Sequence, residues 1–195
     1  MNPLPNTITL CGFSGAGKTT IAELFAERHP NYSFIDLDSY IEEKYSKTVS
    51  EIFALQGESM FREYEFSTLN EIFNNSKKGV SNSCKKIIIS LGGGSLTLDK
   101  TRELVKRESF CIYLKCSPEV LAERIAEEKE REKRPLIKSS VTKGANLAEW
   151  VSVTLSHREP LYLESAIGQI DTTIWDEEKI VCGIEEILTR NAMPL

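Results

Sequence analysis

The residues best suited to chemistry form a glycine-rich loop near the start of the chain. The stretch Gly12–Thr19 fits the pattern G-x-x-x-x-G-K-[ST], the signature of a phosphate-binding loop. Its glycines let backbone N–H groups wrap around phosphate oxygens, and a helix beginning there adds the partial positive charge of its N-terminus. Lys18 would reach the β- and γ-phosphates, and the Thr19 hydroxyl would bind Mg²⁺. The loop predicts a nucleoside triphosphate ligand, with ATP the working candidate; a glycine turn before an ordinary helix is the alternative.

The surroundings of this loop fit the same interpretation. A short β-prone run, Thr7–Cys11, precedes it, and apolar residues at helical spacing follow it from Ile21 to Phe25. The loop therefore lies between a strand and a helix, where it must lie to hold phosphate. The residues predicted to bind the nucleotide here are Gly12, Ser14, Gly15, Ala16, Gly17, Lys18, Thr19 and Thr20.

Two aspartates are the next candidates. Asp36 ends the strand-like run Tyr32–Asp36, and Asp38 follows it in Asp36-Leu37-Asp38. In extended backbone, residues i and i+2 face the same side, so both carboxylates could line one pocket. We predict that Asp36 belongs to the Mg²⁺ site and that Asp38 accepts a substrate hydroxyl proton. Asp38 could also cap a helix beginning at Ser39, a role compatible with catalysis.

An arginine and a run of glycines extend the set. Arg62 lies beside an apolar stripe at helical spacing, and Glu65 is placed to pair with it. Its guanidinium could instead clamp a carboxylate bidentately, although a helix salt bridge is the simpler interpretation of this residue alone. Gly92, Gly93 and Gly94 follow an apolar run, a pattern typical of backbone that approaches a ligand closely.

The elements that must position these residues alternate along the chain. Strand-like runs alternate with helix-like runs, which predicts a single α/β domain over residues 1–195, with a five-stranded parallel sheet flanked by helices. Ligands of such sheets bind outside the carboxyl ends of the strands, and this rule places Gly12, Asp36, Gly92 and Lys115 along one rim. The predicted strands are Thr7–Cys11, Tyr32–Asp36, Lys86–Ser90, Phe110–Lys115 and Ala166–Asp171.

Two segments interrupt the alternation. Residues 74–85 are rich in Asn, Ser and Lys and are predicted to form an extended surface loop. Residues 127–146 begin as a charged helix and pass through Arg134-Pro135 to Lys143-Gly144. That charge run could be only a solvated helix face; the sharper prediction is a mobile lid near the nucleotide.

Composition limits the partners of the chain. Its 195 residues suit one domain, and its net charge of −5 and pI of about 5.3 disfavour a nucleic-acid partner. We expect no membrane partner, because no apolar run approaches the ~20 residues that cross a bilayer, and no basic leader precedes the domain. The five cysteines have no metal-ligand spacing, so a reduced cytoplasm is expected. We expect a monomer.

Other classes of phosphate-loop protein fit less well. A GTPase would need a guanine-reading Asn-Lys-x-Asp and a switch Asp-x-x-Gly, and the sequence contains neither. A non-catalytic nucleotide-binding protein would not need the acids and arginines described above.

The ordered set of motifs resembles the shikimate kinases over nearly the whole chain. A phosphate loop alone is shared by very many families, whereas this ordered combination is specific. The matching stretches are Gly12–Thr19, Asp36–Asp38, Ile52–Glu65, Ile89–Gly94, Lys133–Leu136 and Arg158–Tyr162.

The resemblance implies a kinase fold similar to that of nucleoside-monophosphate kinases, and phosphorylation of the 3-hydroxyl of shikimate by ATP with Mg²⁺ on the route to chorismate and aromatic amino acids. It implies that Asp36 supports Mg²⁺ through water and that the lid residue Arg134 reaches both ATP and substrate. Lys18, Asp38 and Arg134 are then the catalytic residues. The implied shikimate-binding residues are Asp38, Arg62, Gly92, Gly93, Gly94 and Arg158.

Departures from the family pattern lie on the nucleotide side and in the loops. An arginine ahead of the lid stacks on adenine in this family; Arg124 matches best, with Arg131 as the alternative. The connection from Glu65 to Gly92 is long, with the excess in residues 74–85, and surface loops tolerate such growth at small cost. The loop after Asp171 matches only loosely. A gluconate-kinase-like enzyme and a non-catalytic nucleotide-binding relative remain the alternatives.

Overall fold

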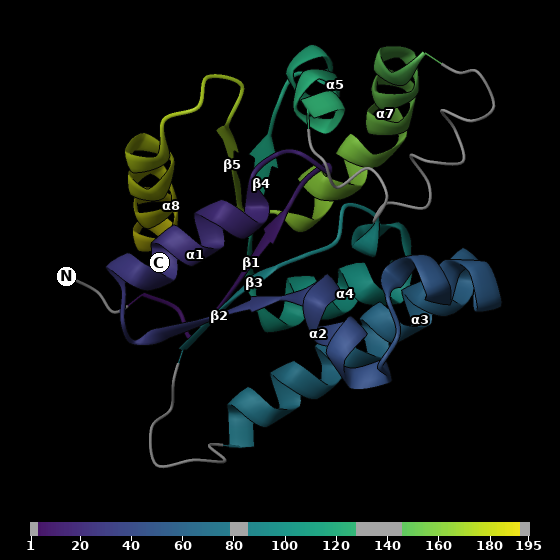
Figure 1. The fold of residues 1–195 in the computed structure, drawn as a ribbon. Helices are drawn as coiled ribbons and strands as arrows, with labels where there is room; N and C mark the ends of the chain where they lie inside the picture. The colour runs from purple at the N-terminus through teal and green to yellow at the C-terminus, as the bar shows by residue number, and fades with distance from the viewer. Residues whose placement is uncertain (1–3, 79–85, 128–145, 192–195) are drawn as a thin grey trace.

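The computed structural model describes residues 4–78, 86–127 and 146–191, and five strands form one parallel sheet within them. The sheet order is β2-β3-β1-β4-β5, so the first strand of the chain lies at the centre (Figure 1). Because every pair of neighbouring strands is parallel, all five strands end at the same edge of the sheet. The strands are β1 (Thr7–Cys11), β2 (Tyr32–Asp36), β3 (Lys86–Ser90), β4 (Phe110–Lys115) and β5 (Gly168–Asp171).

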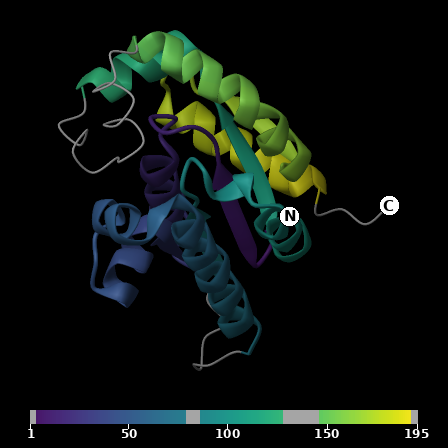
Figure 2. The same ribbon diagram turned by 90° about the vertical axis from the view of Figure 1, so that its right-hand side faces the viewer.

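Helices cover both faces of this sheet. α1 and α8 pack together on one face, while α4 and α7 pack against β4 on the other, with α3 beside α4 (Figures 1 and 2). The central strands are buried on both faces for this reason: Ile8 and Ile88 lie on one face, and Ile89 and Cys111 lie on the other. The helices are α1 (Lys18–Arg28), α2 (Leu37–Tyr45), α3 (Val49–Lys78), α4 (Asp99–Glu108), α5 (Pro118–Glu127), α7 (Leu147–Ser165) and α8 (Glu177–Asn191), with a 3₁₀ turn η1 (Ser95–Thr97).

The predicted α/β class and the five parallel strands are confirmed, with two differences in bounds. The last strand begins at Gly168, because Ala166 caps α7 and donates its N–H to Tyr162 O. The predicted loop over residues 74–85 begins too early, because its first residues continue α3 to Lys78. Ser76 Oγ donates to Phe73 O within that last stretch of helix, 2.8 Å away, and Lys77 pairs with Glu108.

Other predicted segments fall partly or wholly beyond what the structure describes. Residues 79–85 of the predicted loop are among these. Of the predicted lid over 127–146, the structure describes only Glu127, which ends α5, and Asn146, which caps α7 by accepting a bond from Ala148 N. Arg131 and Arg134 also lie outside the described residues. None of the helices that are described is long and apolar enough to cross a membrane.

Candidate active site

A cleft of about 1060 Å³ opens at the carboxyl edge of the sheet. It is lined from the phosphate loop, α2, α3, the loop after β3, α5, α7 and the segment before α8, so it gathers elements from the whole chain. Most of the predicted site residues meet there: Ser14, Gly15, Gly17, Lys18, Thr19, Thr20, Asp36, Asp38, Arg62, Gly92, Gly93, Gly94, Arg124 and Arg158.

The phosphate loop has the backbone its glycines permit. Gly15 and Gly17 have φ of 84° and 87°, values that other residues rarely adopt. Gly17 caps α1 without a side-chain hydrogen bond, so the N–H groups of the first turn face the cleft ready for an anion. Lys18 is 8% exposed, and its Nζ donates to Phe13 O at 2.8 Å. This arrangement holds an ammonium group at the mouth of the loop.

Gly12 and Ala16 differ from the other loop residues, because both are buried and neither lines the cleft. Gly12 has φ of 143°, and a Cβ there would lie 2.6 Å from Leu114 O. Its contribution is therefore to let the loop pass close to β4.

Thr19 and Asp36 form the acidic, oxygen-rich part of the cleft. Thr19 Oγ1 donates to Asp36 Oδ2 at 2.8 Å, and Asp36 Oδ1 accepts from Ser39 N at 3.0 Å. Among the residues described, no three His, Cys, Asp or Glu side chains gather as a metal cluster. One carboxylate with a hydroxyl fits Mg²⁺, since that ion keeps several waters and shares substrate phosphates instead of filling an all-protein cage.

Asp38 reaches the cleft by a different route from the one predicted. The strand ends at Asp36, which itself caps α2, so Asp38 lies in the first helical turn and the argument from extended backbone was wrong, as was the idea that Asp38 is the cap. Its Oδ1 is nevertheless buried at the cleft and has no hydrogen bond within the described structure. Burial, with help from Glu65 and Asp36, raises the pKa of Asp38 to about 7.

Arg62 is held between two acids. Nη1 donates to Glu65 Oε2 at 2.7 Å, and Nη2 donates to Glu58 Oε1 at 2.7 Å. Glu65 is fully buried and also accepts from Ser95, whereas the Glu58 side chain is 43% exposed. The helix salt bridge that the sequence favoured is present, and the Arg62 side chain also lines the cleft; its clamp on a carboxylate stays a prediction.

The glycines after β3 are required by close approach. A Cβ on Gly94 would lie 2.1 Å from Arg62 Nη2, and one on Gly92 would lie 2.9 Å from Asp38 Oδ1. Gly93 O accepts from Arg158 Nη1 at 3.2 Å and from Tyr162 OH at 2.5 Å. The three glycines thus bring backbone against the acid and both arginines.

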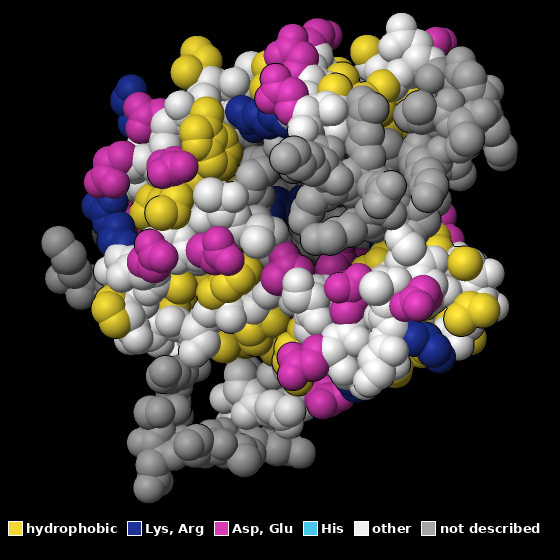
Figure 3. All heavy atoms as spheres, in the orientation of Figure 1, with side chains coloured by type: hydrophobic (Ala, Val, Ile, Leu, Met, Phe, Trp, Pro, Cys, Tyr) yellow, Lys and Arg dark blue, Asp and Glu magenta, His cyan; other side chains and the backbone are white. Residues whose placement is uncertain are grey.

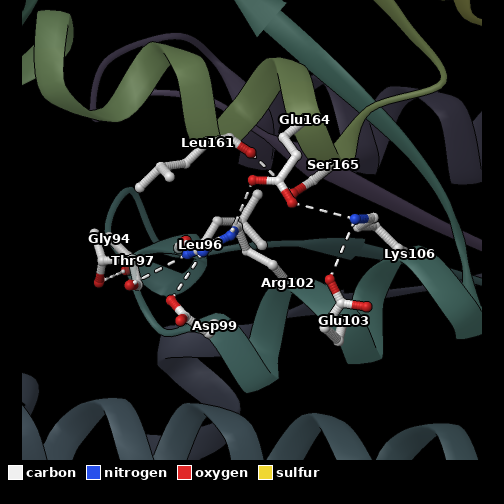
Figure 4. Close-up of polar contacts among 10 residues, drawn as sticks. All are labelled: Gly94, Leu96, Thr97, Asp99, Arg102, Glu103, Lys106, Leu161, Glu164 and Ser165. Atoms are coloured by element: carbon white, nitrogen blue, oxygen red, sulfur yellow. Dashed lines mark hydrogen bonds and ion pairs between the residues drawn. The ribbon is translucent and has the colours of Figure 1, made fainter.

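Arg102 ties this glycine loop to α7, and the sequence analysis did not identify it. Its Nη1 donates to Leu96 O at 2.9 Å, while Nε lies 3.4 Å from Glu164 Oε2 (Figure 4). Thr97 Oγ1 donates to Gly94 O at 2.7 Å and completes the connection. Because α7 also carries Arg158, the network fixes two sides of the cleft against each other. Only the Asp99 and Arg102 pair at helical spacing was visible in the sequence.

Arg124 lines the cleft beside the phosphate loop, and its predicted contact with the nucleotide stays a prediction. Nη2 donates to Thr172 O at 2.8 Å and Nη1 to Gly15 O at 3.3 Å. Its guanidinium carbon lies 5.1 Å from the ring centre of Trp175, another cleft residue that the sequence analysis missed.

Figure 3 shows the charge on the face where the cleft opens. Acidic side chains are spread over the described surface on this face, whereas lysines and arginines form small separate groups. An anionic substrate must therefore find its positive charge inside the cleft, at Lys18, Arg62, Arg124 and Arg158.

Comparison with known proteins accounts for this arrangement. The model of the shikimate kinase family matches residues 14–189. The chain belongs to the shikimate kinase family. A shikimate kinase of Chlorobaculum parvum is 37% identical over 185 residues, 92% of this chain and 89% of the relative. A shikimate kinase of Chlorobium phaeovibrioides is 37% identical over 186 residues, 94% of this chain and 85% of that relative.

Solved shikimate kinases have the same fold. One from Acinetobacter baumannii, in complex with shikimate, has a TM-score of 0.82 at 29% identity and covers 97% of this chain and 96% of that one. One from Bacteroides thetaiotaomicron has a TM-score of 0.78 at 32% identity and covers 94% of this chain and 98% of that one. A gluconokinase from Sinorhizobium meliloti has a TM-score of 0.52 at 19% identity, and this likeness shows a shared fold alone. The predicted family and fold class are confirmed; the roles of single residues stay predictions.

Proposed function

We propose that this protein transfers the γ-phosphoryl group of ATP to the 3-hydroxyl of shikimate, giving shikimate 3-phosphate and ADP in the biosynthesis of chorismate and aromatic amino acids. Its membership in the shikimate kinase family supports this function. The carrying observation is local: the buried, unpartnered Oδ1 of Asp38 shares one cleft with Lys18 of the phosphate loop and with Arg62. Transfer of a phosphoryl group to a hydroxylated acid needs a base for the hydroxyl, a cation beside the phosphate and a guanidinium that binds the carboxylate.

The nucleotide end of the cleft would hold the ATP phosphates. Backbone N–H groups of Gly15–Thr19 would surround them, and Lys18 would place its charge beside the group transferred. Thr19 and Asp36 are the residues that would hold Mg²⁺, Asp36 through water. When bound, the ion would neutralise charge on the phosphates.

The other end would hold the acceptor. Arg62 and Arg158 would bind the shikimate carboxylate, because planar guanidinium forks match a carboxylate in a way that lysine does not. Gly92, Gly93 and Gly94 would let backbone approach the ring closely. Asp38 would accept the proton of the attacking hydroxyl as the oxygen bonds to phosphorus. The complex of the Acinetobacter baumannii relative with shikimate supports this assignment of the substrate.

Further parts of the proposal rest on the sequence and the family. Arg134, on a lid over residues 127–146, would reach ATP and substrate and exclude water. The protein would act as a monomer in the cytoplasm, without nucleic-acid or membrane partners.

The test is ADP release measured with shikimate and with gluconate as acceptors. We expect ADP release and shikimate 3-phosphate with shikimate only. Release with gluconate alone would instead identify a gluconate-kinase-like enzyme. Nucleotide binding without turnover of either acceptor would identify a non-catalytic relative.

Arg62→Ala and Arg158→Ala should each raise the KM for shikimate strongly while ADP affinity stays nearly constant. Loss of one charged partner in a desolvated site costs roughly 2–5 kcal/mol, so the rise should be about 30-fold or more. Arg158→Ala is the cleaner variant, because removing Arg62 also strands the fully buried Glu65. Arg107→Ala, which removes an exposed arginine on α4, is the control and should change neither constant.

Thermal melts beside shikimate titrations separate a clamp from a structural ion pair. A lower melting temperature with unchanged shikimate affinity in both variants would refute the carboxylate role. Shikimate methyl ester should bind the native protein much more weakly than shikimate does, because the ester carries no negative charge for the guanidinium groups to bind. Equal binding of the ester and the acid would also refute the carboxylate role.

A further inference from the structure

The glycine loop, Gly92–Gly94, lies between the acceptor side of the cleft and the phosphate loop. Its first glycine lies against Asp38 and its last against Arg62, so close that neither position has room for a Cβ. Its middle glycine lies against the phosphate loop, because a Cβ on Gly93 would lie 3.1 Å from Ser14 N and 3.2 Å from Ser14 Oγ. The position of the glycine loop therefore sets the spacing between Asp38, Arg62 and the phosphate loop.

The carbonyl of Gly93 is where α7 holds the glycine loop. Tyr162 OH donates to Gly93 O at 2.5 Å, and Arg158 Nη1 donates to the same oxygen at 3.2 Å. Both donors come from α7, about one helical turn apart. Arg158 lines the cleft, whereas Tyr162 does not line it and is only 2% exposed. A buried phenol and a guanidinium in the cleft therefore share one acceptor.

The phenol is the donor better suited to hold this carbonyl throughout turnover. Its ring is buried and packs on Tyr113, with the ring centres 5.2 Å apart, so it has little freedom to move. Burial raises the pKa of Tyr162 well above its usual value, and the hydroxyl therefore stays protonated and remains a donor. Arg158, in contrast, would turn part of its guanidinium toward the substrate carboxylate.

We propose that Tyr162 is a positioning residue for phosphoryl transfer: its hydroxyl holds Gly93 O and so keeps the glycine loop at the spacing from the phosphate loop that the transfer requires. This inference rests on the proposed function, because it needs an acceptor lying on the glycine loop. It goes further by giving a role to the last residue of the Arg158–Tyr162 motif, of which only Arg158 had one.

A small shift at Gly93 would disturb the transfer more than it would disturb binding of nucleotide. An acceptor resting on the glycine loop moves with it, whereas the phosphates are held by the phosphate loop itself. Transfer depends steeply on the distance and alignment of the reacting atoms, so a displacement far too small to unfold the site lowers the rate. Without the phenol, Gly93 O would also depend more on Arg158, which the substrate carboxylate needs.

Other contacts keep the glycine loop folded when the phenol is removed. Thr97 Oγ1 donates to Gly94 O at 2.7 Å, and Arg102 Nη1 donates to Leu96 O at 2.9 Å in the turn that follows (Figure 4). These bonds hold the end of the loop that lies away from Tyr162. Loss of the phenol should therefore let the loop shift at Gly93 without unfolding it.

The test is Tyr162→Phe, which removes one oxygen atom and keeps the ring packed on Tyr113. We expect kcat with saturating shikimate to fall about 10- to 100-fold, since a misplacement of about 1 Å caused away from the chemistry can cost about 10²-fold. The KM for shikimate should rise as well, because Arg158 is drawn toward Gly93 O. The affinity for ADP should stay native.

Tyr113→Phe is the matched control. Tyr113 is the other ring of the pair, is 1% exposed, and donates its OH to Glu159 Oε1 at 3.1 Å instead of to the glycine loop. The variant removes an equally buried phenol oxygen and should lower the melting temperature by a similar amount. Its kcat and KM for shikimate should remain native.

Turnover is expressed per folded molecule, counted from thermal melts, so that lost stability does not pass for lost activity. Native kcat in folded Tyr162→Phe overturns the inference, and so does a higher KM at native kcat, which would limit Tyr162 to binding. Equal losses in Tyr162→Phe and Tyr113→Phe, or a Tyr162→Phe protein that fails to fold while Tyr113→Phe folds, would make the phenol a stability element and overturn it too. All of these results leave the kinase function standing if the native protein turns over shikimate; a native protein without that turnover overturns both.

Discussion

Lys18→Ala should lower kcat by about 10³-fold or more while the protein remains folded. A unit charge about 4 Å from another contributes roughly 4 kcal/mol at the effective dielectric of such sites, which corresponds to that factor in rate. Lys18 begins α1 and its Nζ is held by Phe13 O, so its charge is fixed before any ligand arrives. Charge that needs no reorganisation during transfer is the kind that stabilises a transition state most.

The measurement is a steady-state assay beside a thermal melt. Alanine favours the helix at this position, and removal of a nearly buried ammonium leaves no large cavity, so the melting temperature should stay close to native. Lys115→Ala is the matched control: Lys115 ends β4 near the same edge of the sheet, but it is exposed and does not line the cleft. That variant should keep turnover within a few-fold of native. Near-normal turnover in a folded Lys18→Ala protein would show that Lys18 of the phosphate loop does not stabilise the transferred phosphoryl group.

The strands were predictable because local sequence determines them. Runs such as Lys86–Ser90 are short, apolar and β-branched, and a parallel sheet buried on both faces needs that composition. The phosphate loop was predictable because its spacing has a mechanical reason that is independent of the rest of the fold. Both features are written in consecutive residues.

Features that depend on tertiary packing were missed or misplaced. α3 continues through the polar residues Asn74–Lys78 because Ile72 and Phe73 anchor the preceding turn in the core. Asp38 was predicted on extended backbone, since nothing local shows that Asp36 already caps a helix. Contacts between distant residues, such as Trp175 on Gly17 or Arg102 with Glu164, have no signature in a single sequence.

Asp38→Asn should lower kcat by about 10²–10⁴-fold, the usual contribution of a positioned general base. Asparagine keeps the size and one carbonyl oxygen of the side chain but cannot accept the hydroxyl proton. Asp38 suits the role because its Oδ1 is buried without a hydrogen bond among the described residues, and because burial raises its pKa to about 7. A carboxylate with that pKa is both ionised enough and basic enough to work near neutral pH.

Stability distinguishes this role from a structural one. The ionised carboxylate is disfavoured by burial and by its neighbours Glu65 and Asp36, so an uncharged amide relieves repulsion. The melting temperature of Asp38→Asn should therefore equal or exceed that of the native protein, and its ADP affinity should be unchanged. Glu119→Gln, which neutralises an exposed acid in the first turn of α5, is the control for the helix dipole and should keep full activity. A folded Asp38→Asn protein with native kcat would show that another group takes the proton; a lower melting temperature at native kcat would make Asp38 a structural acid. Loss of turnover without loss of stability is the combination expected of a carboxylate that acts on the substrate, because a purely structural acid would lower the melting temperature when it is replaced.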